Sequence, residues 1–221
     1  IDKVYSSIDM QGRYRFSNQP HVAVWNLSRL AETLLPLIHN DQNTSIKKAE
    51  ESLKIFLPLF TSHWVEIMGR KLGIEEPKSF DKALIESLLT NMQKGNADFT
   101  QTFRKLPNTL EKKKECEWFA LFSDPKNSDL HNWQKNWRNR VEPTKNNKIS
   151  IIRRLKNNNP YVIPRNHIIE KCISEGLKGD LTRFHRLTKA LEMPFEEKAE
   201  YYDFSLPPKE NEIVHHTFCG T

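Results

Sequence analysis

Apolar side chains recur at every third or fourth position along most of the chain, which is the period of an α-helix. The first stripe lies within residues 19–37 and consists of Trp25, Leu27, Leu30, Leu34 and Leu37. Asn18 stands where an N-cap is expected, and Pro20 suits the first helical turn. Pro36 is expected to kink or end the helix, because its ring clashes with the preceding turn. We therefore predict one helix that buries its stripe.

A second, longer stripe predicts a helix that starts at Thr44 or Ser45 and stops at Gly73. Its members are Ile46, Ala49, Leu53, Phe56, Phe60, Trp64 and Ile67. Pro58 falls inside this stretch and predicts a kink. Gly73 suits the left-handed conformation that commonly ends a helix.

Four further helical segments are predicted in the middle of the chain. Ser79 is expected to cap a helix that Gly95 closes, and a short segment follows over residues 99–103. Residues 109–122 and 128–141 form two more helices. The second of these carries two tryptophans four residues apart, which places both on one helical face.

The last part of the chain predicts a helical hairpin and a tail. Pro164 opens a helix, and Gly179 with Asp180 forms a stop-and-cap pair before the partner helix, so the two helices are antiparallel. After Pro194 the sequence predicts an extended tail. No long stretch alternates apolar and polar residues as a strand does, and the fold class is therefore all-α.

The composition and charge of the chain argue against two classes of binding partner, membranes and nucleic acids. The 221 residues are 37% hydrophobic and 28% charged, which is typical of a globular protein. No run approaches the roughly 18 apolar residues of a membrane span, so we expect no membrane partner. The net charge is +6, but the basic runs 112–114 and 153–154 adjoin glutamates or apolar helix positions. We interpret them as solvated helix faces and expect no nucleic-acid partner.

Single residues give weak chemical signals. The tripeptide 203–205, Asp-Phe-Ser, resembles a metal-binding motif of protein kinases, although aromatic residues that pin the tail to the core explain it better. His215 and His216, with Cys219, have the residue types of a zinc site but lack an evident fourth ligand. His167 and His185 adjoin apolar stripes and are interpreted as structural.

The three cysteines form no CxxC pair and are odd in number, which favours a reducing compartment over a disulfide framework. Cys116 and Cys172 fall on predicted helices, where a small buried residue would serve equally well. Cys219 differs, because it lies at the end of the tail, where a thiol is accessible to oxidation or pairing.

Short motifs spread over nearly the whole chain point to one family. In chain order they are Ser6-Ser7-Ile8-Asp9, Gly12-Arg13-Tyr14, Asn18-Gln19-Pro20, Trp25-Asn26-Leu27, Met68-Gly69-Arg70-Lys71-Leu72-Gly73, Asp81, Ala97-Asp98-Phe99-Thr100, Asn159-Pro160, Pro164-Arg165-Asn166, Gly179-Asp180 and Phe218-Cys219-Gly220-Thr221. The sequence resembles the selenoprotein O, or YdiU, family in these motifs and their order. Residues 107–157 are the least diagnostic part.

The resemblance implies a fold and an activity. Family members are similar to protein kinases in fold, bind ATP with magnesium, and transfer AMP to serine, threonine or tyrosine hydroxyls of protein substrates. The family's nucleotide-binding, catalytic and metal-binding residues lie N-terminal to residue 1, so no residue of this chain inherits those roles. The resemblance therefore implies the C-terminal portion of an adenylyltransferase, inactive alone and partnered by the N-terminal half.

The same resemblance assigns regions and one regulatory residue. Residues 1–141 correspond to a kinase-like C-lobe that begins at the end of the activation segment. Residues 142–221 correspond to a helical extension and redox tail, packed with the first region as one unit. Cys219 matches the family's redox-controlling position, and its partner lies upstream, so we expect a free thiol.

Other expectations are less specific. Arg13 and Arg15 could anchor the activation segment or a protein substrate, and the role of Arg165 stays open. The location implied is the bacterial cytoplasm, or the mitochondrion for a eukaryotic relative. The alternative hypothesis is a non-enzymatic helical adaptor that binds protein or nucleic acid, which a steep salt dependence of nucleic-acid binding would reveal.

Overall fold

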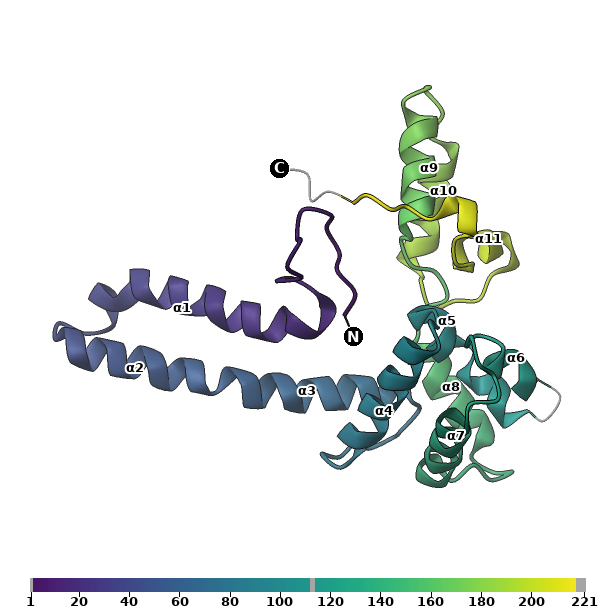
Figure 1. Cartoon of the computed structure of the whole chain (residues 1–221), viewed down its shortest axis with the longest axis horizontal. Helices are drawn as coiled ribbons and strands as arrows, with labels where there is room; N and C mark the ends of the chain where they lie inside the picture. Colours follow the sequence, from purple (N-terminus) through teal and green to yellow (C-terminus); the bar gives the residue numbers. More distant parts are fainter. Residues whose placement is uncertain (1, 112–113, 218–221) are drawn as a thin grey trace. The chain divides into compact units, whose positions relative to one another are not determined.

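The computed structural model describes residues 2–111 and 114–217, and within these ranges every regular element is an α-helix or a short 3-10 helix (Figure 1). The all-α class is thereby confirmed. The chain divides into two compact units, which are residues 1–66 with 216–221 (the first unit) and residues 67–215 (the second unit). The expected boundary at 141 and 142 falls inside the second unit. The expected boundary separates a kinase-like region from a helical extension. The division into compact units does not test that likeness, so the boundary stays a prediction.

The α-helices are α1 (Gln19–Ile38), α2 (Gln42–Lys54), α3 (Phe56–Lys71), α4 (Asp81–Lys94), α5 (Phe99–Arg104), α6 (Glu115–Phe119), α7 (Ser128–Val141), α8 (Lys148–Asn158), α9 (Asn166–Gly176), α10 (Thr182–Glu192) and α11 (Tyr202–Ser205). None of those within the described ranges combines the length and apolarity that a bilayer crossing requires.

In the first unit α1 and α2 form an antiparallel hairpin (Figure 1). The Asp41 carboxylate caps α2 by accepting a hydrogen bond from the Thr44 backbone N–H at 2.8 Å. Ser45 and Ala49 are buried, and the Ser45 hydroxyl donates to the Leu35 carbonyl at 2.5 Å. The small side chains of α2 let the two backbones approach closely.

The stripe that the sequence predicted to be buried on α1 is exposed instead. Trp25 is 48% exposed, Leu30 54% and Leu37 83%. The partly buried positions of α1 lie on a neighbouring side of the helix, at Val24, Ser28, Ala31, Leu35 and Ile38. Periodicity identified an apolar face correctly, but not whether this chain covers it.

The long predicted helix is broken between Lys54 and Phe56. Pro58 explains the position of the break, because proline has no N–H to donate to the carbonyl four residues earlier and its ring crowds that carbonyl. The expected effect of Pro58 therefore appears one turn before the proline. Pro36 lies inside α1, which ends two residues later.

Three fully buried tryptophans organise the second unit. The Trp118 and Trp133 rings stack with their centroids 5.7 Å apart, and Trp133 and Trp137 follow at 6.1 Å. Each indole N–H donates at 2.8 Å to a backbone carbonyl, namely that of Thr102 in α5, of Leu84 in α4 and of Leu72 directly after α3. The aromatic stack therefore joins α6 and α7 to α3, α4 and α5.

Two glycine positions behave as predicted. Gly73 ends α3 with φ +75°, and a Cβ there would lie 2.9 Å from Leu155 Cγ of α8. Gly179 has φ +88°, and the Asp180 carboxylate accepts from the Thr182 backbone N–H at 2.9 Å. Helices α9 and α10 thus form the expected hairpin.

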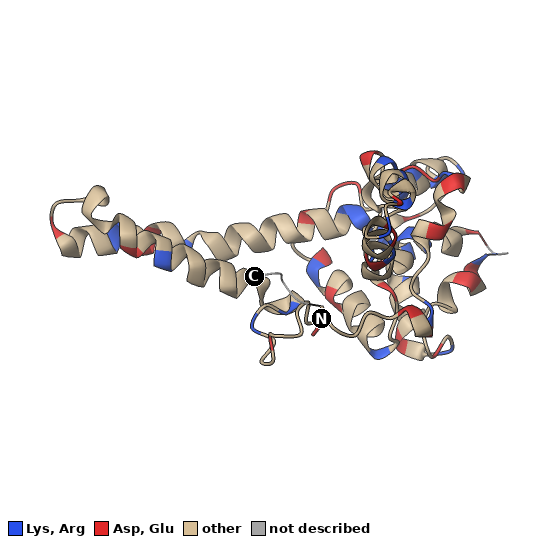
Figure 2. Cartoon of the chain, turned by 90° about the horizontal axis from the view of Figure 1, so that it is seen from above, with Lys and Arg blue, Asp and Glu red and all other residues tan. Residues whose placement is uncertain are grey.

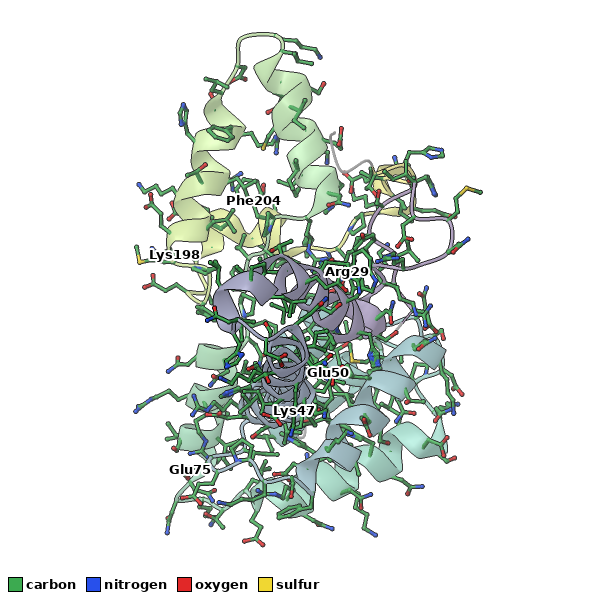
Figure 3. The ribbon with its side chains drawn as sticks, turned by 90° about the vertical axis from the view of Figure 1, so that its left-hand side faces the viewer. Arg29, Lys47, Glu50, Glu75, Lys198 and Phe204 are labelled. Carbon is green, nitrogen blue, oxygen red and sulfur yellow. The ribbon has the colours of Figure 1, made fainter. Side chains whose placement is uncertain are left out.

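Other helix boundaries differ from those that the sequence predicted. Ser79 does not cap α4, which begins at Asp81, and the expected helix over 109–122 is reduced to α6. The segment after Pro194 folds into short helical turns over residues 199–205. Tyr201 and Phe204 are buried there against the α9–α10 hairpin, with Phe204 at its base (Figure 3). Aromatic pinning of the tail is therefore confirmed.

Lys71, the last residue of α3, is largely buried between α5 and α8. Its ammonium nitrogen lies 5.2 Å from the Phe103 ring centroid and 5.7 Å from that of Phe99. It donates to the Asn158 carbonyl at 3.3 Å. Burial lowers the pKa of Lys71 from 10.5 to about 8, since a charged ammonium loses hydration there.

This burial predicts a specific pH dependence. Below pH 8 Lys71 is protonated in both the folded and the unfolded state, so the free-energy cost of burying its charge is fully present. Between pH 8 and 10.5 Lys71 loses its proton in the folded state before it does so in the unfolded state. The free-energy cost of the buried charge therefore decreases over this range. The unfolding free energy of the parent minus that of Lys71→Met should therefore rise over this range, by up to about 3 kcal/mol. Urea unfolding followed by tryptophan fluorescence at pH 7, 9 and 10 measures it, and a pH-independent difference would contradict it.

Candidate functional site

The segment before α1 is a tightly hydrogen-bonded loop in the first unit. The Asp9 carboxylate accepts from the backbone N–H groups of Arg13 and Tyr14 at 2.8 and 2.7 Å. Gly12 is buried with φ +64°, a conformation that favours glycine. The Asn18 amide donates to the Arg13 carbonyl at 2.6 Å and does not cap α1 as predicted. The motif residues here thus build the loop itself.

The C-terminal tail pairs with this loop. The Ser7 N–H donates to the Thr217 carbonyl at 2.7 Å, and the Thr217 N–H donates to the Ser7 hydroxyl at 2.9 Å. The Thr217 hydroxyl also donates to the Tyr5 carbonyl at 2.6 Å. All these residues belong to the first unit. The candidate redox residue Cys219 is two positions further on and lies outside the described residues.

The two candidate arginines of the loop have different surroundings. The exposed Arg13 guanidinium carbon lies 4.3 Å from the Trp25 ring centroid, a cation–π contact. Arg15 donates through Nε to the Ser17 hydroxyl at 3.2 Å and lies 3.8 Å from the Asp2 carboxylate. Arg13 therefore lies on a half-exposed aromatic side chain in the first half of α1.

Arg165, whose role was open, joins separate parts of the second unit. It is 8% exposed and grips the Asp98 carboxylate with two hydrogen bonds of 2.7 and 3.0 Å. Asp98 also caps α5 through the Gln101 N–H at 2.8 Å. Burial alone would raise the pKa of Asp98, but the hydrogen bonds from Arg165 and Gln101 outweigh it and lower the pKa.

Two further motif residues also connect separate segments of the second unit through hydrogen bonds. The fully buried Asp81 carboxylate accepts from Arg140 at 2.7 and 3.1 Å and from the Lys78 N–H at 2.7 Å. The Asn159 amide donates at 2.8 Å to the carbonyls of Lys71 and Leu155. Sequence reasoning did not assign the contacts of Asp81 with Arg140 and of Asn159 with Lys71, because these partners are 59 and 88 residues apart along the chain.

Two cavities in the second unit are lined by arginines that are already engaged. One of about 650 Å³ contains Arg140 and Arg154, and Arg154 donates to the Gly73 carbonyl at 3.0 Å. The other, of about 290 Å³, contains Arg104, which donates to the carbonyls of Lys156 and Asn159 at 3.0 and 2.9 Å. These cations hold helix ends together rather than facing a ligand freely.

The carboxylates of the described residues do not fit a magnesium–nucleotide site. Within the part of the chain that the structure describes, no group of three His, Cys, Asp or Glu side chains is placed to hold a metal ion. Asp203 of the kinase-like tripeptide is held by Arg186 at 2.6 and 2.8 Å, and this hydrogen bonding lowers the pKa of Asp203. A magnesium ion would have to displace the guanidinium groups from Asp81, Asp98 and Asp203.

The cysteine and histidine predictions are partly corrected. Cys172 is buried in the core of the α9–α10 hairpin, and burial raises the pKa of its thiol. Cys116 is exposed, because it occupies the outer side of the short helix α6, and the prediction of burial was wrong. His167 is buried, and burial lowers its pKa, whereas His185 is exposed.

Comparison with known proteins gives the family. The family model for the protein adenylyltransferase SelO matches residues 2–192. The chain belongs to this family. A protein nucleotidyltransferase YdiU of Alkaliphilus metalliredigens is 41% identical over 220 residues, and proteins of the same name from Bacillus cytotoxicus and Brevibacillus brevis are 39% and 40% identical over 219.

Each of these three comparisons covers 99% of this chain but 43% of the relative. The chain thus spans less than half the length of the curated SelO-family proteins that it matches. The predicted resemblance is confirmed, and the relatives are named as nucleotidyltransferases. The loop and joints described above are therefore features of one portion of a SelO-type protein.

The environments of Cys116 and Cys172 predict an order of reactivity. In the folded protein a maleimide should modify Cys116 rapidly and Cys172 about 100-fold more slowly, since burial hinders access and raises its pKa. Cys219 should also react, as a free thiol. Peptide mass spectrometry of native samples, with guanidinium-unfolded samples as the control, measures all three rates. Cys219 recovered in a disulfide with Cys116 or Cys172 would contradict the prediction.

Proposed function

We propose that the chain is the helical supporting portion of a SelO-type protein adenylyltransferase, which transfers AMP from ATP to serine, threonine or tyrosine hydroxyls of proteins. The observation that carries the proposal is the family match over residues 2–192. The contacts of Asp81, Asp98 and Arg165 support a structural contribution, because each is already paired with an opposite charge inside the second unit. ATP and magnesium would then be held by residues outside this chain.

A redox role for Cys219 is part of this proposal. Thr217 is tied to residues 5–7 by three hydrogen bonds of 2.6–2.9 Å. By family resemblance these residues belong to the exit of the activation segment. The pairing supports a role for the tail close to that segment, where oxidation of Cys219 would change how the tail is tethered.

Protein substrates and the remainder of the family's sequence are the proposed partners. Many basic side chains of the second unit lie close to carboxylates, for example Arg154 with Glu75 at 3.2 Å and Lys156 with Glu197 at 3.2 Å. Because these basic side chains are already paired with carboxylates, we propose that the chain has no nucleic-acid partner. This argues against an adaptor that binds nucleic acid. The relatives named above are bacterial, and we propose a bacterial cytoplasmic location.

Grafting tests the proposed function. The matched portion of the Alkaliphilus metalliredigens relative is replaced by this chain, and AMP transfer from α-labelled ATP to protein is measured with magnesium. The chimera should retain transfer within about tenfold of the relative, while a version with the portion deleted should lose it. A folded chimera without transfer would contradict the proposal.

The isolated chain should not bind the nucleotide. Calorimetry with magnesium and ATP should give no heat of micromolar binding with the 221-residue chain, because the buried carboxylate of Asp81 and the partly buried carboxylate of Asp98 are held by arginines. The intact relative serves as the positive control. Micromolar binding by the chain alone would contradict this prediction, and steeply salt-dependent binding to nucleic acid would favour the adaptor.

A further inference from the structure

One side of α1 is apolar, continuous and exposed. We define the α1 face as Leu27, Leu30, Leu34 and Leu37, which are 36%, 54%, 40% and 83% exposed. Steps of three and four residues place these four side chains in one stripe along the helix. Arg29 and Glu32 are the charged residues of α1, so most of this helix has the tan colour of the other residues in Figure 2.

The beginning of α3 continues this pattern on more than one side. Leu57, Leu59 and Phe60 are 40%, 51% and 37% exposed, and Ile55 just before the helix is 58% exposed. Consecutive residues of a helix point about 100° apart, so this segment is apolar around its circumference. A helix that is apolar all round belongs in a protein interior.

The first unit supplies no interior for these side chains. Among its described residues the buried apolar side chains are Val22, Ala49 and Val65. The charged side chains Arg29, Lys47 and Glu50 lie on α1 and α2 (Figure 3), and none interrupts the α1 face.

The comparisons indicate what covers these helices. The SelO-family relatives are more than twice as long as the matched portion. A second copy of this chain would cover one face of a hairpin, whereas an all-round apolar segment and a neighbouring stripe require a larger body. We propose that, in a full-length family member, the α1 face and residues 55–60 are the docking surface for the portion of the family's sequence that lies outside this chain.

The inference rests on family membership and not on AMP transfer. Its test therefore measures burial rather than activity. Leu30→Cys and Leu37→Cys are introduced into the isolated chain and into the grafted full-length chimera. The matched control is Leu177→Cys, since Leu177 in the second unit is 85% exposed and lies outside the proposed surface.

Maleimide labelling of each cysteine is then quantified by peptide mass spectrometry. Leu30→Cys and Leu37→Cys should label rapidly in the isolated chain and about 100-fold more slowly in the chimera. Leu177→Cys should label at the same rate in both. The same substitutions at the aligned positions of the intact Alkaliphilus metalliredigens relative repeat the measurement in a natural protein.

Two results would overturn the proposal. The first is rapid labelling of both positions in the folded chimera and in the relative, which would show that the surface stays open. The second is slow, concentration-dependent labelling in the isolated chain, with a sedimentation mass of a dimer, which would show that a second copy covers the surface.

Discussion

The second unit depends on three indole rings that are each buried and each hydrogen-bonded. A tryptophan contributes a large apolar surface, but burying it requires a partner for its N–H group. Trp118 and Trp133 find that partner in backbone carbonyls of α5 and α4, and Trp137 finds it in the Leu72 carbonyl directly after α3. The rings stack against one another, and their N–H groups bond to the backbone of neighbouring segments. These two kinds of contact together fix the distance between the helices and the orientation of each helix about its axis.

The described residues of the first unit form no comparable centre. Its hairpin is held by small side chains, Ser45 and Ala49, and by a network of loop hydrogen bonds around Asp9. Such contacts position helices but bury little apolar surface, and hydrophobic stabilisation is roughly proportional to the area removed from water. The unit therefore has defined local structure together with an uncovered apolar surface, a combination that suits one part of a larger core.

Local signals allowed much of the fold to be predicted. The turn at Gly73, the stop-and-cap pair at Gly179 and the shared face of the α7 tryptophans depend on residues close in sequence. The burial of the α1 stripe was predicted wrongly, because a 3.6-residue period reports an apolar side and not what lies against it. The Asp98–Arg165 joint spans 67 residues, and no spacing rule connects two such charges.

The motif residues share a position that explains why they were hard to interpret chemically. Gly73, Asp98, Asn159, Arg165 and Gly179 all lie close to helix ends, in the caps or in the short turns between helices. Helix ends carry the unpaired backbone groups, so a residue there sets the direction in which the chain leaves and the neighbour that it meets. A carboxylate used in this way is tied to a guanidinium or to backbone N–H groups, and little of its charge is available to a ligand. In this chain, these five motif residues therefore set the directions in which neighbouring helices meet.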